Sequence, residues 1–67
     1  MIRLWRARRR HDHVDAVLDR AGSGWELRFL WNDKPMIARR YRHAQAARTE
    51  AANKLRDLER NGWVSHW

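Results

Sequence analysis

Apolar and polar residues alternate along several segments of the chain. In one segment four apolar residues occupy every second position: Trp25, Leu27, Phe29 and Trp31. Glu26 and Arg28 lie between them, so the pattern predicts a half-buried strand over residues 25–31. Residues 13–18 alternate in a similar way, and Ala21-Gly22-Ser23-Gly24 between the two segments has the composition of a turn. We therefore expect an antiparallel hairpin.

A second turn and a third strand follow. Residues 32–35, Asn-Asp-Lys-Pro, are typical of a tight turn, and residues 36–41 read as a strand. Proline has no N–H to donate to a neighbouring strand, so its place at the start of this segment favours an edge strand.

The register of this second hairpin depends on the length of its loop. A two-residue loop would place Met36 and Ala38 beside the Trp25 face, whereas a three-residue loop would place Ile37 and Tyr41 there. We favour Ile37 and Tyr41 because they make the better core.

Residues 43–60 carry an apolar stripe with helical spacing. Its members are Ala44, Ala47, Ala51, Leu55 and Leu58. Asn61-Gly62 is a helix stop signal. A stripe made mostly of alanine lets a helix approach a sheet closely, and bulky side chains must fill the remaining core. The candidates are Trp25, Phe29, Trp31 and Trp63.

These elements predict an α+β fold in which three antiparallel strands, or four, pack on one C-terminal helix. Residues 13–67 would form a single β-β-β-α domain. Residues 1–12 have two interpretations: a basic N-terminal arm, or an extra strand in which Trp5 packs into the core. Trp5 could otherwise stack on a base of single-stranded nucleic acid, and we favour the core.

The length and composition limit what the chain can do. A chain of 67 residues buries only about 60% of the surface that its unfolded form exposes, so the core is small and dimerisation is an alternative source of stability. There is no cysteine. No apolar run is long enough for a signal-peptide core or a membrane span, so we expect a cytoplasmic protein without a membrane partner.

Positive charge is concentrated in two blocks. The net charge is +7, and thirteen of the fifteen basic residues are arginine. Residues 1–11 carry +5, residues 12–33 carry −3 and residues 34–67 carry +5. Arginine forms paired hydrogen bonds with phosphate and stacks on aromatic rings, so this composition suits a polyanionic partner.

The predicted fold gives these arginines positions. Arg28 and Arg40, together with Arg20, would lie on the sheet face away from the helix, which could enter a DNA major groove. The predicted nucleic-acid-binding residues are Arg8, Arg9, Arg10, Arg28, Lys34, Arg40 and Arg42. The other interpretation is structural: a sheet covered on one side always has a solvated polar face, and a short basic terminus can simply keep a protein soluble.

Metal and catalytic sites are not expected. His11-Asp12-His13 offers only two imidazoles, zinc needs four ligands, and His43 and His66 are distant in sequence. The few hydroxyl side chains have no histidine at a suitable spacing. A nuclease that uses His13 and His43 as acid and base is a distant alternative. We therefore predict no metal, no cofactor and no enzymatic activity.

The order of features from Trp25 to Gly62 resembles the arm-binding domain of phage-type tyrosine integrases. The resemblance rests on the Trp-x-Leu-x-Phe strand, the strand ending Arg39-Arg40-Tyr41 and the alanine-rich helix. It implies a three-stranded sheet that packs on a C-terminal helix and lies in the DNA major groove. Arg28, Lys34 and Arg40 would then lie on the reading face. The pattern also resembles small uncharacterised bacterial proteins.

Two functional hypotheses follow. The first is a small non-enzymatic module that binds nucleic acid, in particular DNA. The alternative is a protein-interaction or self-associating module with no nucleic-acid role, in which tryptophans and arginines meet an acidic partner or a second copy. Trp63 and Trp67 would form its apolar patch if they are exposed.

Overall fold

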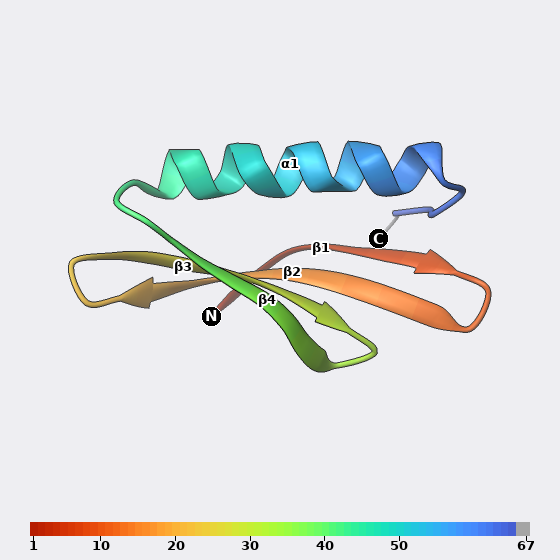
Figure 1. Ribbon diagram of the computed structural model, residues 1–67, viewed down its shortest axis with the longest axis horizontal. Coiled ribbons are helices and arrows are strands. Elements are labelled where there is room, and N and C mark those ends of the chain that lie inside the picture. Colours follow the sequence, from red (N-terminus) through yellow and green to blue (C-terminus); the bar gives the residue numbers. More distant parts are fainter. Residues whose placement is uncertain (66–67) are drawn as a thin grey trace.

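The computed structural model describes residues 1–65 as a four-stranded antiparallel sheet with a helix across one face (Figure 1). The elements are β1 (Ile2–Arg9), β2 (Asp12–Ala21), β3 (Gly24–Trp31), β4 (Lys34–Tyr41) and α1 (Ala44–Arg60). The strands lie in the order β1-β2-β3-β4. The predicted α+β class is confirmed, and residues 2–9 are a strand of the sheet. Trp67, whose packing the sequence left open, lies outside the described residues.

Short turns connect neighbouring strands. Gly22 in the β2–β3 turn has a φ of +59°, a left-handed conformation that glycine adopts without strain. Asn32 and Asp33 in the β3–β4 turn have φ values of +49° and +72°. The Asn32 side chain ties this turn to β2, because its amide oxygen accepts a hydrogen bond from the backbone N–H of His13 at 2.9 Å.

A bulge lies in each edge strand. In β4, Pro35 pairs with Leu30 and Ile37 pairs with Phe29, which leaves Met36 as the extra residue. Ile37 and Tyr41 consequently face the helix, as we expected. The loop itself is two residues long, and the bulge supplies the third residue that this register needs. A similar irregularity at Leu4 separates Arg3 from Trp5 in β1.

The core lies between the sheet and α1. Its buried members are Trp5, Ala7, Val14, Ala16, Leu18, Leu27, Phe29, Ala47, Ala51 and Trp63. Ala47 and Ala51 are the helix residues with almost no exposed surface, which is what a close helix–sheet approach requires. The Trp5 indole N–H donates a buried hydrogen bond of 2.9 Å to the Ala51 carbonyl oxygen. Trp5 thus joins the outermost strand to the middle of the helix.

The chain after α1 folds back along β1. The backbone N–H of Trp63 donates to the Leu58 carbonyl oxygen at 3.1 Å, and Arg8 and Val64 exchange two backbone hydrogen bonds of 2.9 Å. Trp63 is buried, as predicted, but Trp31 is 38% exposed, so its assignment to the core was wrong. Trp63 meets Trp31 edge to face, with ring centroids 5.4 Å apart.

No helix of residues 1–65 is both long enough and apolar enough to cross a membrane.

Candidate nucleic-acid interface

The sheet face away from α1 carries both arginines and carboxylates. Strand pairing places Arg6 opposite Asp15, and Glu26 opposite both Asp19 and Arg40. Residues paired across strands share a face, so opposite charges here lie within reach of one another. A hollow of about 470 Å³ on this open face is bordered by Arg3, Arg6 and Arg28 and by Asp15 and Asp33.

Arg28, predicted to contact DNA, is engaged by two carboxylates. Its terminal nitrogen Nη2 bonds to Asp19, and its Nε lies 3.7 Å from a carboxylate oxygen of Glu26. The same Glu26 approaches the Nε of Arg40 at 3.9 Å. The Arg40 side chain nevertheless stays 73% exposed, against 33% for Arg28. Of Arg28 and Arg40, Arg40 is therefore the more accessible.

Arg6 and Asp15 form a bidentate ion pair on the open face. The Nε of Arg6 donates to one oxygen of Asp15 at 2.6 Å, and Nη2 donates to the other at 2.9 Å. Asp15 is only 5% exposed. These hydrogen bonds from Arg6 lower the pKa of Asp15 below its ordinary value of 3.8, and they outweigh burial, which acts in the opposite direction.

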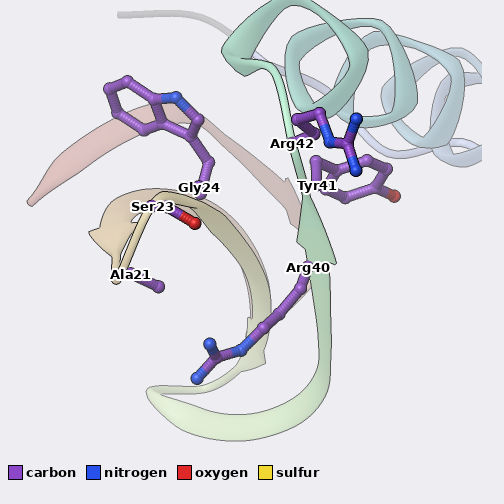
Figure 2. Close-up of a pocket in the computed structure, with 7 residues that line it drawn as sticks. Ala21, Ser23, Gly24, Arg40, Tyr41 and Arg42 are labelled. Carbon is purple, nitrogen blue, oxygen red and sulfur yellow. The ribbon is translucent and has the colours of Figure 1, made fainter.

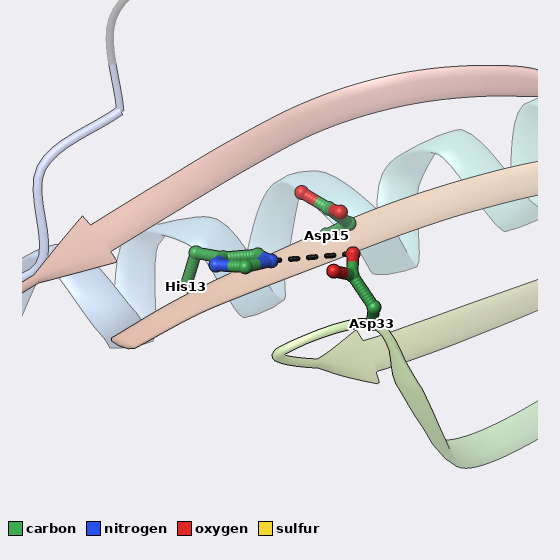
Figure 3. A group of neighbouring side chains, drawn as sticks. All are labelled: His13, Asp15 and Asp33. Carbon is green, nitrogen blue, oxygen red and sulfur yellow. Dashed lines mark hydrogen bonds and ion pairs between the residues drawn. The ribbon is translucent and has the colours of Figure 1, made fainter. Parts of the chain in front are cut away.

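Beside this pair lies a cluster of possible metal ligands (Figure 3). His13, Asp15 and Asp33 place one ligand atom each within 4.8 Å of one another. The Nε2 of His13 lies 3.3 Å from an oxygen of Asp33. Arg6 already uses both oxygens of Asp15 and lies 4.0 Å from Asp33, so a metal ion would have to displace its guanidinium. The cluster is not the His11-Asp12-His13 group considered from sequence, because Asp12 accepts a hydrogen bond from Asn32 instead.

The basic residues near the β1–β2 turn occupy one end of the molecule. Arg8, Arg9 and Arg10 are all exposed there. Arg9 donates a hydrogen bond of 2.8 Å to the Asn61 carbonyl oxygen, and its guanidinium lies 5.0 Å from the Trp63 ring centroid. Lys34 follows the β3–β4 turn toward the same end, whereas Arg42 lies at the opposite end of the molecule, which is 38 Å long (Figure 1). The two basic blocks thus do not lie together.

A pocket of about 210 Å³ lies at the Arg42 end (Figure 2). Its lining residues are Ala21, Ser23, Gly24, Trp25, Arg40, Tyr41 and Arg42. We call this the basic–aromatic pocket. It borders residues 34–49, a stretch with five basic residues and no acidic one. Arginine and aromatic side chains therefore meet here with few neighbouring carboxylates.

Three chain segments build this pocket. The β2–β3 turn supplies Ser23 and Gly24, the end of β4 supplies Arg40 and Tyr41, and Arg42 begins the link to α1. A Cβ atom on Gly24 would lie 2.6 Å from the Tyr41 carbonyl oxygen. Only glycine allows the turn to approach β4 so closely. The position of Arg40 and Arg42 beside the turn thus depends on Gly24.

The aromatic side of the pocket was not expected from sequence. Trp25 and Tyr41 are partners across β3 and β4, and both are half-buried against the core. The guanidinium of Arg20 lies over the Trp25 ring, 5.0 Å from its centroid. Arg20 is thus on the helix-facing side, and its assignment to the open face was wrong, because it pairs with Trp25 and paired residues share a face. If the register of β2, β3 and β4 had been known, it would have placed Arg20, Trp25 and Tyr41 side by side.

The pocket retains a positive field. Within residues 1–65, neither Arg20 nor Arg42 forms an ion pair with a carboxylate. His43 precedes α1 without a side-chain cap, and the first helical turn contains no acidic residue. The partial positive charge of the helix N-terminus therefore adds to that of the arginines.

His13 and His43 do not share a site. His13 lies at the start of β2, and the backbone N–H of Asn32 in the β3–β4 turn bonds to its carbonyl oxygen. His43 follows β4, whose last residue, Tyr41, pairs with Trp25 at the other end of β3. The intervening part of β3 spans roughly 20 Å. One phosphate could not contact both imidazoles.

An apolar groove separates α1 from β3 and β4 near the opposite end. It encloses about 170 Å³ and is lined by Val14, Phe29, Leu30, Trp31, Met36, Ile37, Lys54 and Leu58. Met36 and Ile37 are 66% and 43% exposed. The two ends of the sheet thus differ: this groove is lined mainly by apolar side chains, whereas the basic–aromatic pocket is lined by arginines and aromatic side chains.

Comparison with known proteins adds no assignment. No protein-family model matches the chain, and neither the search of curated proteins nor that of solved structures found a match. The resemblance to integrase arm-binding domains stays a prediction.

Proposed function

We propose that this protein is a non-enzymatic nucleic-acid-binding module whose contact surface is centred on the basic–aromatic pocket. One observation carries the proposal: two accessible arginines, Arg40 and Arg42, line one pocket together with Trp25 and Tyr41, and residues 34–49 around these arginines contain no acidic residue. Guanidinium groups bind phosphate oxygens in pairs, and aromatic rings stack on bases, so both parts of a nucleotide find a partner here.

The proposal shifts the contact surface from the open face to one end of the sheet. Nucleic acid that bound Arg28 would have to compete with Asp19 and Glu26. Within residues 1–65, no carboxylate competes at Arg42, and at Arg40 the competition is limited to one carboxylate 3.9 Å away. The accessible arginines therefore favour phosphate contact at the pocket.

The opposite basic end has a supporting role in this proposal. Arg8, Arg10 and Lys34 are exposed, and they lie at the far end of a molecule 38 Å long. At 3.4 Å per nucleotide along one strand, that length corresponds to about 11 nucleotides of duplex. We expect affinity to rise with oligonucleotide length up to about this size, because longer strands can reach both ends.

Salt-dependent binding tests the proposal. Fluorescence anisotropy with labelled DNA should show affinity that falls steeply with salt, because each neutralised phosphate releases counterions. The double variant Arg40→Gln/Arg42→Gln should lower the slope of log affinity against log salt by about two. Arg56→Gln/Arg60→Gln removes the same charge from the exposed end of α1 and is the matched control. If the unmodified protein binds neither single-stranded nor duplex DNA at low salt, the proposal is wrong.

Self-association is the competing hypothesis, and the apolar groove is its main support. β4 borders that groove, yet the strand carries three basic residues and no acidic one. Direct pairing with β4 of a second copy would therefore bring like charges together. Light scattering of nucleic-acid-free protein decides between the two: we expect a monomer, and a dimer would favour self-association.

A further inference from the structure

We infer that the basic–aromatic pocket receives one unpaired nucleotide, so that the protein prefers single-stranded nucleic acid to duplex. This inference rests on the proposed function and specifies its ligand. It requires a pocket of suitable size, donors for a phosphate and an accessible ring face for a base.

The pocket can hold part of one nucleotide, either its base or its phosphate. Its volume of about 210 Å³ lies below the roughly 300 to 1,000 Å³ typical of small-molecule sites. It is bounded by the β2–β3 turn on one side and by the end of β4 on the other (Figure 2). A hollow of this kind can take a residue that protrudes from a strand, whereas a duplex presents no such residue unless a base is flipped out.

Donors for a phosphate come from separate segments. Arg40 lies near the end of β4, Arg42 in the link before α1, and the Ser23 hydroxyl in the β2–β3 turn. Arg42 has no carboxylate partner within residues 1–65, and Arg40 has only a distant one. The two guanidinium groups point apart (Figure 2), so each would meet a different phosphate of the strand, with charge-assisted hydrogen bonds and without breaking a close ion pair.

Arg20 indicates which ring accepts the base. Its planar guanidinium lies over Trp25, so that face of the indole can accommodate a flat group. Arg20 is exposed and has no carboxylate partner in the described part of the chain, so a base can take its place over the ring. In a duplex, base faces are covered by their neighbours, and only an unpaired base offers a face to Trp25.

The contact between Arg9 and Trp63 is, by contrast, a structural one that leaves no ring face for a ligand. Arg9 also lies 5.0 Å from a tryptophan ring centroid, that of Trp63. Trp63, however, is only 5% exposed, and Arg9 is held by a hydrogen bond to the Asn61 carbonyl oxygen. A base cannot reach that ring. The distance from guanidinium to ring centroid is the same in both contacts, but of the two rings only Trp25 is available to a ligand.

Abasic DNA tests this inference without changing the protein. Oligodeoxythymidylate, an abasic strand of the same length and a duplex of the same length would be titrated at one low salt concentration. We expect the thymidylate to bind about tenfold more tightly than the abasic strand, which carries the same phosphates but no base to stack. It should also bind more tightly than the duplex.

Substitution of Trp25 then tests whether this ring causes the difference in affinity between the thymidylate and the abasic strand. Trp25→Leu should bring the affinity for thymidylate down to that for the abasic strand, whereas Trp31→Leu, at the other end of β3, should preserve the difference. Because Trp25 is half-buried, circular dichroism must show that the variant is folded, and Arg20→Gln provides an exposed substitution at the same ring. Arg20→Gln should leave the preference for thymidylate intact, because the base replaces Arg20 on the ring.

The outcomes separate the inference from the proposed function. Equal affinity for thymidylate and abasic strands would overturn the inference, while salt-dependent binding of both would still support the proposed function. Tighter binding of the duplex would also overturn it. Failure of the protein to bind any of the three at low salt would remove both.

Discussion

The open face of the sheet and the basic–aromatic pocket use the same kind of residue in opposite ways. On the open face, Arg6 and Arg28 each meet a carboxylate at hydrogen-bonding distance. At the pocket, Arg20 and Arg42 meet none within residues 1–65, and Arg40 has one distant partner. Positive charge alone therefore does not identify a binding surface. What matters is how much of that charge the protein has already neutralised.

The difference follows from where the acidic residues lie in the chain. Five of the eight carboxylates fall in residues 12–33, which form β2, β3 and their neighbouring turns. The middle of the sheet thus neutralises Arg6 of β1 and Arg28 of β3. Residues 34–49 lie beyond it, in the edge strand and the start of α1, where the nearest ion-pairing carboxylate is that of Glu26.

The largest expected effect is on the stability of the open face. Asp15→Asn would leave the partly buried Arg6 without its bidentate partner, and we expect the free energy of unfolding to fall by about 2 to 3 kcal/mol. Urea denaturation measures this loss. Asp57→Asn breaks an exposed ion pair with Arg60 and should cost less than about 0.5 kcal/mol. Similar losses for both would contradict the distinction between buried and exposed pairs.

Acid should remove the contribution of the Arg6–Asp15 ion pair to the stability of the fold. The pKa of Asp15 in the folded protein lies below the 3.8 expected for the unfolded chain, because Arg6 hydrogen-bonds to the ionised form. The pair therefore stabilises the fold fully above pH 3.8, and its contribution is lost as the pH falls through the folded pKa. In urea titrations at a series of pH values, the unmodified protein and Asp15→Asn should converge in stability below pH 3.8. A constant difference between them would show that Asp15 is not the group responsible.

A smaller effect is expected from the turn beside the pocket. Gly24→Ala would force its Cβ against the Tyr41 carbonyl oxygen, so β4 or the turn must shift, and we expect a loss of about 1 to 2 kcal/mol in stability together with weaker DNA binding. Gly22→Ala is the control: it strains a positive φ, but its Cβ would have no atom within 4 Å. It should cost about 1 kcal/mol and leave DNA binding unchanged.

The smallest expected effect is on DNA affinity, after substitution of an arginine on the open face. Arg28→Gln removes an arginine that already has two carboxylate neighbours, so we expect DNA affinity to change by less than about twofold, or 0.4 kcal/mol. Anisotropy at low salt measures this. A loss as large as that of Arg40→Gln/Arg42→Gln would show that the open face binds DNA after all, as the major-groove interpretation requires.

Much of the fold was predictable because it depends on local patterns. Period-two alternation identified the central hairpin, and the alanine–leucine stripe identified α1 to within a residue of its start at Ala44. The bulges at Leu4 and Met36 were not predictable, since each depends on which partner strand the chain meets. Trp31 was misplaced for a related reason: the fold-back of Trp63 is a tertiary event that no pattern in β3 reports.

The candidate site was predictable only in part. From sequence, Arg40 was selected as a residue of the sheet face away from the helix, and Arg42 as a basic residue at the junction between the last strand and the helix. The contributions of Gly24, Trp25 and Arg20 come from strand pairing and close backbone approach, so sequence composition could not group them. The ion pairs of Arg28 were likewise invisible, because opposite charges on neighbouring strands meet only in one register.

The bulge at Met36 decides which face each later residue of β4 presents. Deleting Met36 would leave Pro35 opposite Leu30 and Ile37 opposite Phe29, so the rest of β4 would keep its register and its faces. Losing the bulge with all residues retained would instead move Met36 opposite Phe29, which would turn Arg40 toward the helix and Tyr41 toward the open face. In natural or designed variants of this protein, deletion of the single codon for Met36 would therefore disturb the pocket less than a change that straightens the strand.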